Sequence, residues 1–175
     1  MSGVTRILGI DPGSRITGFG IIDSDGRRSV HVANGCIRTA AGALPLRLQT
    51  IFSGVQALVL QYQPGAVAVE QVFMARNADS ALKLGQARAA AICATFGCGA
   101  EVFEYAARVV KQAIVGAGNA EKAQVSHMVA VLLNYREALE VDAADALAVA
   151  LCHAHTQPLN ERLAGARRLV AGMRR

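Results

Sequence analysis

Four carboxylates in this sequence stand in apolar surroundings, where an ionised side chain is costly unless something partners it. Asp11 ends the run ILGID, Glu70 lies within AVAVEQVF, and Asp142 and Asp145 occur in EVDAADALAVALC. Carboxylates gathered on a rigid scaffold suit the oxygen-seeking ions Mg²⁺ and Mn²⁺. Two such ions about 4 Å apart activate a water and stabilise the leaving oxygen in phosphodiester hydrolysis. The four residues therefore indicate a metal-dependent phosphodiesterase.

Each carboxylate also has an ordinary structural explanation. Asp11 precedes a Pro-Gly pair and could simply open a turn. Glu70 could be a strand-end residue partnered by an arginine or a lysine. Asp142 could cap a helix and Asp145 could lie in its first turn, where the helix dipole would favour both carboxylates. Their joint occurrence on three separate elements is what favours the metal site.

The first half of the chain predicts the strands that carry Asp11 and Glu70. Three ranges rich in Ile, Val and Thr are separated by turn signals and predict an antiparallel meander: Arg6–Ile10, Ile16–Asp23 and Ser29–Thr39. Apolar residues at helical spacing then predict a helix over Leu44–Tyr62. A strand over Ala66–Phe73 follows, in which period-two alternation places Glu70 on the same face as Ala66 and Ala68.

The second half is mainly helical by the same criteria. We expect a helix capped by Asp79 or Ser80 and ending near Phe96, and a strand over Ala100–Tyr105. Three helices should follow, over Ala106–Val115, Ala120–Tyr135 and Asp142–His155. This order predicts an α/β fold, with a mixed five-stranded sheet of a meander plus parallel strands and helices on both faces. The predicted domain spans residues 1–156, and residues 157–175 form a basic, partly flexible tail.

Composition narrows the class of protein. A chain of 175 residues with 53% hydrophobic content is long enough for one packed domain. Its net charge of +5 is compatible with nucleic-acid binding but does not require it. No apolar run has the length of a bilayer span, and the N-terminus lacks a signal-peptide pattern, so we expect a cytoplasmic protein. The four scattered cysteines are expected to be reduced thiols.

The carboxylates and their neighbouring strings resemble the RuvC family of bacterial Holliday junction resolvases. The similarity is collinear over nearly the whole chain, from LGIDPGSRITGFGII through GCIRT, VEQVFMARNADSALKLGQARAA, VFEYAARVVKQAIVG and AEKAQV to DAADALAVA. It implies a ribonuclease H-like fold and a homodimeric endonuclease that nicks two opposing strands of a four-way DNA junction. It also implies Mg²⁺-dependent cuts, with Mn²⁺ as a substitute and two ions per site, that leave 5′-phosphate and 3′-hydroxyl ends. The RuvA–RuvB branch-migration complex is implied as a partner.

The resemblance assigns roles to particular residues. Asp11, Glu70, Asp142 and Asp145 fall on the family's catalytic, metal-binding carboxylates. Phe73 falls on an aromatic that could wedge against unstacked bases, although it could equally be an ordinary core residue. The remaining candidates are basic residues near the DNA, any of which could instead be a solvated surface residue: Arg76, Lys83, Lys111 and Lys122.

Two other functions also fit parts of the sequence. An I-G-I-D-x-G string followed by a hairpin also opens actin- and hexokinase-like ATPases, but those proteins need two such lobes and this chain is too short for both. A junction-binding protein without catalysis would leave the four carboxylates with only structural roles. The complete carboxylate set favours the nuclease over both.

Overall fold

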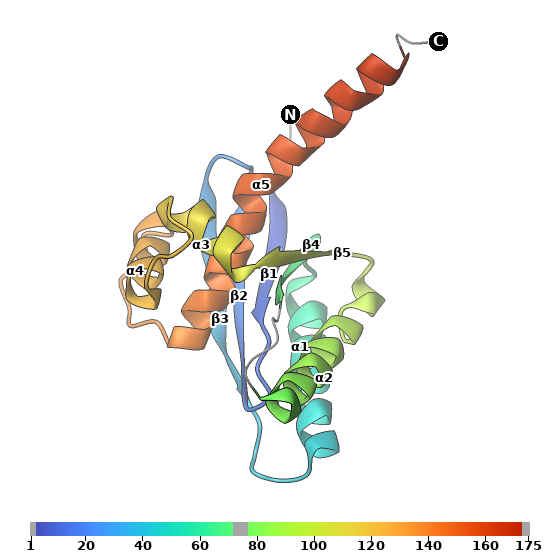
Figure 1. Ribbon diagram of the computed structural model, residues 1–175, viewed down its shortest axis with the longest axis vertical. Coiled ribbons are helices and arrows are strands. Elements are labelled where there is room, and N and C mark those ends of the chain that lie inside the picture. The colour runs from blue at the N-terminus through green and yellow to red at the C-terminus, as the bar shows by residue number, and fades with distance from the viewer. Residues whose placement is uncertain (1–2, 72–76, 173–175) are drawn as a thin grey trace.

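The computed structural model describes residues 3–71 and 77–172, and of residues 158–172 only the course of the backbone is considered. The chain forms one five-stranded sheet with helices on both faces (Figure 1). The strands are β1 (Thr5–Asp11), β2 (Ile16–Ser24), β3 (Ser29–Arg38), β4 (Ala66–Gln71) and β5 (Glu101–Ala106). The helices are α1 (Leu44–Tyr62), α2 (Ala78–Cys93), the short 3₁₀ helix η1 (Phe96–Cys98), α3 (Ala107–Val115), α4 (Lys122–Leu132) and α5 (Val141–Gly172).

The sheet has the order β3-β2-β1-β4-β5. Strands β1, β2 and β3 pair antiparallel as the predicted meander, whereas β4 pairs parallel to β1 and β5 pairs parallel to β4. The prediction of a mixed α/β sheet is confirmed, and the helix over Leu44–Tyr62 has the predicted bounds.

Strand alternation divides the core into two layers. Ile7 of β1 and Ala68 of β4 pack on the side of α5, together with the α3 and α4 residues Val110 and Val129. Their neighbours in the strands, such as Leu8, pack on the opposite side with α1 and α2. Because successive side chains of a strand point to opposite faces, Asp11 and Glu70 lie on the α5 side, where Glu70 shares the face of Ala66 and Ala68 as predicted.

Helix α5 lies directly on the backbone of β1 and β2. A Cβ atom built on Gly9 would stand 2.1 Å from the Ala146 carbonyl oxygen, and one on Gly18 would stand 1.9 Å from the Asp142 carbonyl oxygen. Any larger residue at these positions would push the helix away. The glycines therefore set how closely the start of α5 approaches the sheet.

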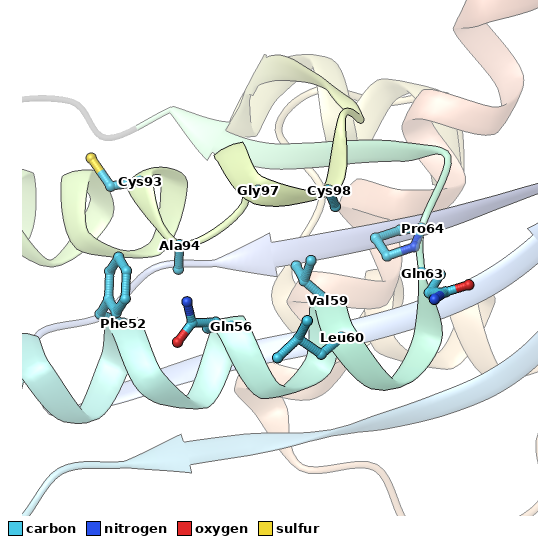
Figure 2. A pocket seen from close by; sticks show the side chains of 10 residues that line it. All are labelled: Phe52, Gln56, Val59, Leu60, Gln63, Pro64, Cys93, Ala94, Gly97 and Cys98. Atoms are coloured by element: carbon cyan, nitrogen blue, oxygen red, sulfur yellow. The ribbon is translucent and has the colours of Figure 1, made fainter.

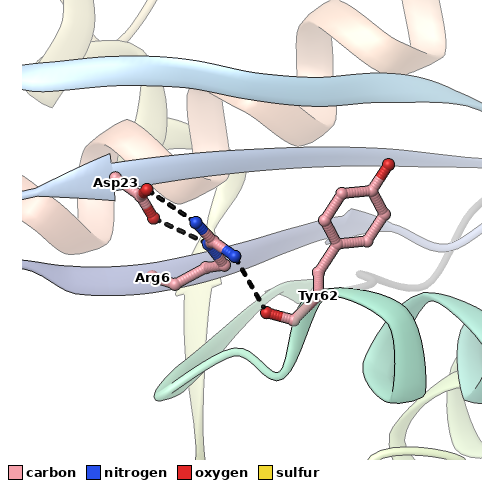
Figure 3. Close-up of polar contacts among 3 residues, drawn as sticks. All are labelled: Arg6, Asp23 and Tyr62. Carbon is pink, nitrogen blue, oxygen red and sulfur yellow. Dashed lines mark hydrogen bonds and ion pairs between the residues drawn. The ribbon is translucent and has the colours of Figure 1, made fainter.

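An ion pair joins the start of β1 to the end of β2. The Arg6 guanidinium makes two 2.8 Å hydrogen bonds to the carboxylate of Asp23, from β1 to β2. A third bond, of 3.3 Å, reaches the Tyr62 carbonyl oxygen at the end of α1 (Figure 3). Arg6 thus connects the meander to the first helix by satisfying one of its terminal carbonyls.

Both limits of α2 and both limits of α5 differ from the prediction. Helix α2 is capped by Asn77, whose side chain accepts a hydrogen bond from the Ser80 amide, and it ends at Cys93, with η1 over Phe96–Cys98. Helix α5 begins at Val141, so Asp142 lies inside the first turn rather than at the cap. It continues past His155 and through Pro158 to Gly172.

All four cysteines are free thiols, as expected. Within the described ranges, none of the helices combines the length and hydropathy needed to span a bilayer.

Candidate active site

Three of the four predicted carboxylates interact on the α5 face of the sheet. Asp11 ends β1, and the parallel register of β1 and β4 runs up to the pair Ile10–Val69, one position before Asp11 and Glu70. Asp11 forms a side-chain hydrogen bond with Glu70 and is also affected by the charge of Asp145 on α5. The structure therefore brings together residues that are up to 134 positions apart, 11 and 145.

Asp142 enters the site through the backbone. Its carbonyl oxygen lies against Gly18, and Gly18 is the residue of β2 that pairs with Asp11. The Asp142 side chain is half-buried in the first turn of α5, where a carboxylate is favoured by the helix dipole. The backbone of Asp142 is thus held beside the same end of β1 as the other three carboxylates, and its side-chain charge acts on Cys36 of β3.

The turn after Asp11 does not depend on its side chain. The Thr17 hydroxyl donates a hydrogen bond of 2.9 Å to the Gly13 carbonyl oxygen and accepts one of 3.3 Å from the Gly13 amide. The carboxylate of Asp11 is instead directed to Glu70. Opening the turn is therefore not the main role of this side chain.

The electrostatics of the cluster are those of crowded carboxylates. The pKa of Asp11 is raised to about 8, first by burial and then by the hydrogen bond to Glu70 and the charges of Glu70 and Asp145. The Lys122 ammonium opposes this rise. Carboxylates this close cannot all ionise without positive charge beside them, which is the condition a divalent cation satisfies.

Lys122 supplies part of that positive charge. Its Nζ atom lies 2.6 Å from Asp145 Oδ2, and this ion pair is the first cause of the raised pKa of Lys122. Asp11 and Glu70 contribute smaller effects in the same direction. Lys122 begins α4, after a capping box formed by Glu121 and Gln124 that fixes the start of the helix. The sequence indicated this lysine as a DNA contact and did not reveal its place beside the carboxylates.

The donor set fits a hard cation, although the side chains do not yet surround a site for one. Among the described residues, no three His, Cys, Asp or Glu side chains are arranged so that they could hold a metal ion. The oxygen-only donors nevertheless match what Mg²⁺ prefers, and the ion would displace the proton that the raised pKa leaves on Asp11.

The other basic candidates have different surroundings. Lys111 of α3 donates a 2.8 Å hydrogen bond to the Ala120 carbonyl oxygen, two residues before Lys122. Lys83 is paired with Asp79 one turn away on α2. The described partners of these two lysines are therefore local, and they are not carboxylates of the cluster. Phe73 and Arg76 lie outside the described residues.

The pocket found between α1 and the end of α2 is separate from this site (Figure 2). Its volume is about 580 Å³, and its lining includes Phe52, Val59, Leu60 and Cys93. Val59 belongs to the core layer on the α1 side of the sheet, opposite α5. The pocket therefore has no part in the chemistry of the carboxylates.

A meander followed by two parallel strands, with acidic residues at the end of β1, on β4 and at the start of α5, defines a nuclease of the ribonuclease H-like class. The particular family follows from comparison with known proteins. Residues 7–153 match the model of the RuvC family, crossover junction endodeoxyribonuclease RuvC. The chain belongs to this family, whose members are metal-dependent nucleases. The ATPase alternative is thereby set aside.

Individual relatives agree with this assignment over most of their length. The RuvC protein of Pseudoalteromonas atlantica is 59% identical over 157 residues, covering 90% of this chain and 89% of the relative. That of Vibrio cholerae is 56% identical over 159 residues, covering 91% and 92%. The structure of Thermus thermophilus RuvC in complex with Holliday junction substrate has a TM-score of 0.84 at 33% identity and covers 89% of this chain and 96% of that one.

The sequence patterns did not predict the role of the glycines against which α5 packs. Gly9, Gly18 and Gly20 alternate along two adjacent strands and face an alanine-rich helix. Glycine is unfavourable inside strands, so Gly18 and Gly20, two positions apart and with Gly9 paired to Gly20 on the neighbouring strand, indicate close backbone approach. Recognising that sign would have predicted which helix crosses β1 and β2.

Proposed function

We propose that this chain resolves four-way DNA junctions by nicking two opposing strands symmetrically, leaving 5′-phosphate and 3′-hydroxyl ends. The observation that carries the proposal is the electrostatic coupling of Asp11 to Glu70 and Asp145 on one face of the sheet, beside the Lys122 ammonium, which lies 2.6 Å from Asp145. The Holliday junction bound by the Thermus thermophilus relative supports the choice of substrate. We further propose that the protein acts in the cytoplasm.

Asp11, Glu70, Asp142 and Asp145 would hold two Mg²⁺ ions, for which Mn²⁺ would substitute. When bound, the ions activate a water and stabilise the leaving oxygen of the phosphodiester. Asp11 interacts with both Glu70 and Asp145 and is therefore the carboxylate we assign to both ions. The hydrogen-bonded turn after β1 and the seat of α5 on Gly18 hold these groups still, which is what an in-line displacement requires of its scaffold.

DNA contacts are proposed for the remaining candidates. Phe73 would stack against unstacked bases at the crossover, and Arg76 and Lys83 would contact phosphates nearby. Lys122 would contact the phosphate next to the cleaved bond, since its Nζ already lies at Asp145. Lys111 would contact phosphate at the same end of α4, and its bond to the Ala120 carbonyl supports an added role in holding that end in place.

Paired cuts require two active sites, so we propose a homodimer that works with the RuvA–RuvB complex. The outer side of α2 is our choice for the dimer contact. Leu82 on α2 and Phe96 just beyond it are each 68% exposed, while Ala87 and Ala91 of the same helix are buried inside the chain. Large apolar side chains left in solvent are typical of protein interfaces.

We retain the proposed division into a nuclease domain, 1–156, and a basic tail, 157–175. The tail contains five arginines and one glutamate, so it carries four of the five net positive charges. The family match ends at residue 153, close to the proposed limit. Limited proteolysis should cut beyond residue 156 and leave a folded nuclease domain.

The test is cleavage of a synthetic four-way junction in the presence of Mg²⁺. The wild-type protein should make paired nicks, and Asp11→Asn should reduce the cleavage rate by at least ~1000-fold while junction binding persists. Glu101→Gln, at an exposed position at the start of β5, is the control for loss of a carboxylate and should cut normally. Normal cutting by Asp11→Asn would refute the assignment of this site.

A further inference from the structure

The loop between α4 and α5, residues 133–140, is attached to the edge strand β3 at two points. The Tyr135 ring lies 4.7 Å from the His31 ring, centroid to centroid, with the planes tilted by 53°. At the other end of the loop, the Arg38 guanidinium pairs with the Glu140 carboxylate. The loop that leads into the carboxylate helix is thereby held by two residues of one strand.

The second attachment acts on the start of α5 itself. Glu140 is the residue before the helix, and its carbonyl oxygen accepts a 2.9 Å hydrogen bond from the Ala144 amide, within the first turn. Its side chain meanwhile contacts Arg38. One residue therefore links β3 to the first hydrogen bond of the helix, two positions before Asp142.

The first turn of α5 also contacts two strands of the meander. The Ala143 amide forms a hydrogen bond with the Cys36 sulfur of β3, and the Asp142 carbonyl oxygen rests on Gly18 of β2. These contacts limit movement of the turn toward the sheet. The pair between Arg38 and Glu140 limits its movement along the sheet edge.

The first attachment depends on an irregularity of β3. The β2–β3 register shifts between Ile21 and Ile22, which pair with Ala33 and His31, so Val32 is the extra residue. Such bulges change the direction of the side chains beside them. His31 is held by the Asn34 side-chain amide, 2.8 Å from its Nε2, and Tyr135 packs against the α5 core layer.

We propose that Arg38 is a positioning residue for the carboxylates of α5, acting through Glu140, and that His31 and Tyr135 steady the same loop. The proposal rests on the proposed function, because it assigns importance to where Asp142 and Asp145 stand. Arg38 and Glu140 have side chains 56% and 53% exposed, so their ion pair contributes little to stability. Its effect on cleavage should be larger, since a displacement of about 1 Å in a catalytic group costs roughly 100-fold in rate.

The experiment uses full-length Arg38→Met, Glu140→Gln and the double variant. Single-turnover junction cleavage, junction dissociation constant and melting temperature are measured, the last with and without Mg²⁺. Arg27→Met, in the exposed β2–β3 turn, is the control for a lost surface charge. Arg38→Lys should restore part of the rate because it keeps a cation beside Glu140.

Positioning predicts that each single variant cleaves about 10- to 100-fold more slowly. The dissociation constant should stay within about twofold, and the double variant should be no slower than the singles, because both remove one interaction. The rise in melting temperature on adding Mg²⁺ should also be smaller in the variants than in wild type.

Two results would overturn the proposal. The first is a wild-type cleavage rate for Arg38→Met. The second is weaker junction binding by Arg38→Met that accounts for its whole loss of rate, together with normal cleavage by Glu140→Gln. That second result would make Arg38 a phosphate contact. A wild-type protein that does not cut junctions would instead refute the proposed function. The Mg²⁺-induced rise in melting temperature would then still test the positioning of the carboxylates by Arg38.

Discussion

The two faces of the sheet are packed by different means. On the α5 face, Gly9 and Gly18 allow helix and strand backbones to touch. On the α1 face, branched side chains such as Ile51 interlock with Leu8 and Ile10. Interlocked side chains relax by small rotations, whereas a backbone in contact with a backbone moves only as a whole. The carboxylates lie on the face that is less able to adjust.

The most direct way to test this difference is to add one methyl group to each face. Gly18→Ala places a Cβ against the Asp142 carbonyl oxygen and should destabilise the protein by about 3 kcal/mol, with loss of cleavage by the molecules that still fold. Gly54→Ala in α1 meets only the Ile37 side chain, and the helix gains an alanine, so its change should stay within about 1 kcal/mol. Denaturant unfolding measures both, and equal costs would contradict the comparison.

The α5 face should also make stability depend on pH. Folded Asp11 keeps its proton up to about pH 8, whereas the unfolded chain loses it near the ordinary value of 3.8. Unfolding therefore releases a proton between these limits, and stability falls as pH rises through that window. The metal-free protein should melt roughly 10 °C lower at pH 8 than at pH 5 through this residue.

The control for that prediction is Asp11→Asn, which removes the titrating group and should show a flatter dependence. Saturating Mg²⁺ should flatten it as well, because bound cations favour the ionised carboxylate. An unchanged pH dependence in Asp11→Asn would mean that Asp11 is not the group responsible.

A mutation in the α1 layer should affect stability without affecting the site. Ile51→Val removes one buried methyl group and should cost about 1 kcal/mol. Because the space left by the missing methyl group lies on the opposite side of the sheet from α5, the cleavage rate per folded molecule and the pH dependence of stability should stay as in wild type. A rate loss beyond the unfolded fraction would show that the two faces are coupled.

The smallest effect is expected at the pocket between α1 and α2. Leu60 lines it and is 72% exposed, so Leu60→Gln should change stability by less than about 0.5 kcal/mol. Junction cleavage should not change either, since the pocket is on the α1 side. A clear drop in cleavage would require a role in catalysis or assembly for this surface.

Local patterns predicted much of the fold. The Ile-, Val- and Thr-rich ranges of the meander, the period of two in β4 and the helical spacing over Leu44–Tyr62 agree with the structure, because each depends on the residues of one element. Element limits were less predictable. Asn77 rather than Asp79 or Ser80 caps α2, and α5 extends to Gly172, because several residues nearby offer similar capping and helix-forming energies.

The sequence by itself determined the residue types of the site and the face of its strand on which Glu70 lies. That face follows from alternation within a strand, which is set by the chain's own covalent geometry. Only the tertiary structure decided that α5 rests on Gly18, that Lys122 reaches Asp145, and that Arg38 holds Glu140. Such contacts join residues far apart in the chain, and they depend on how closely whole elements pack, which no local pattern specifies.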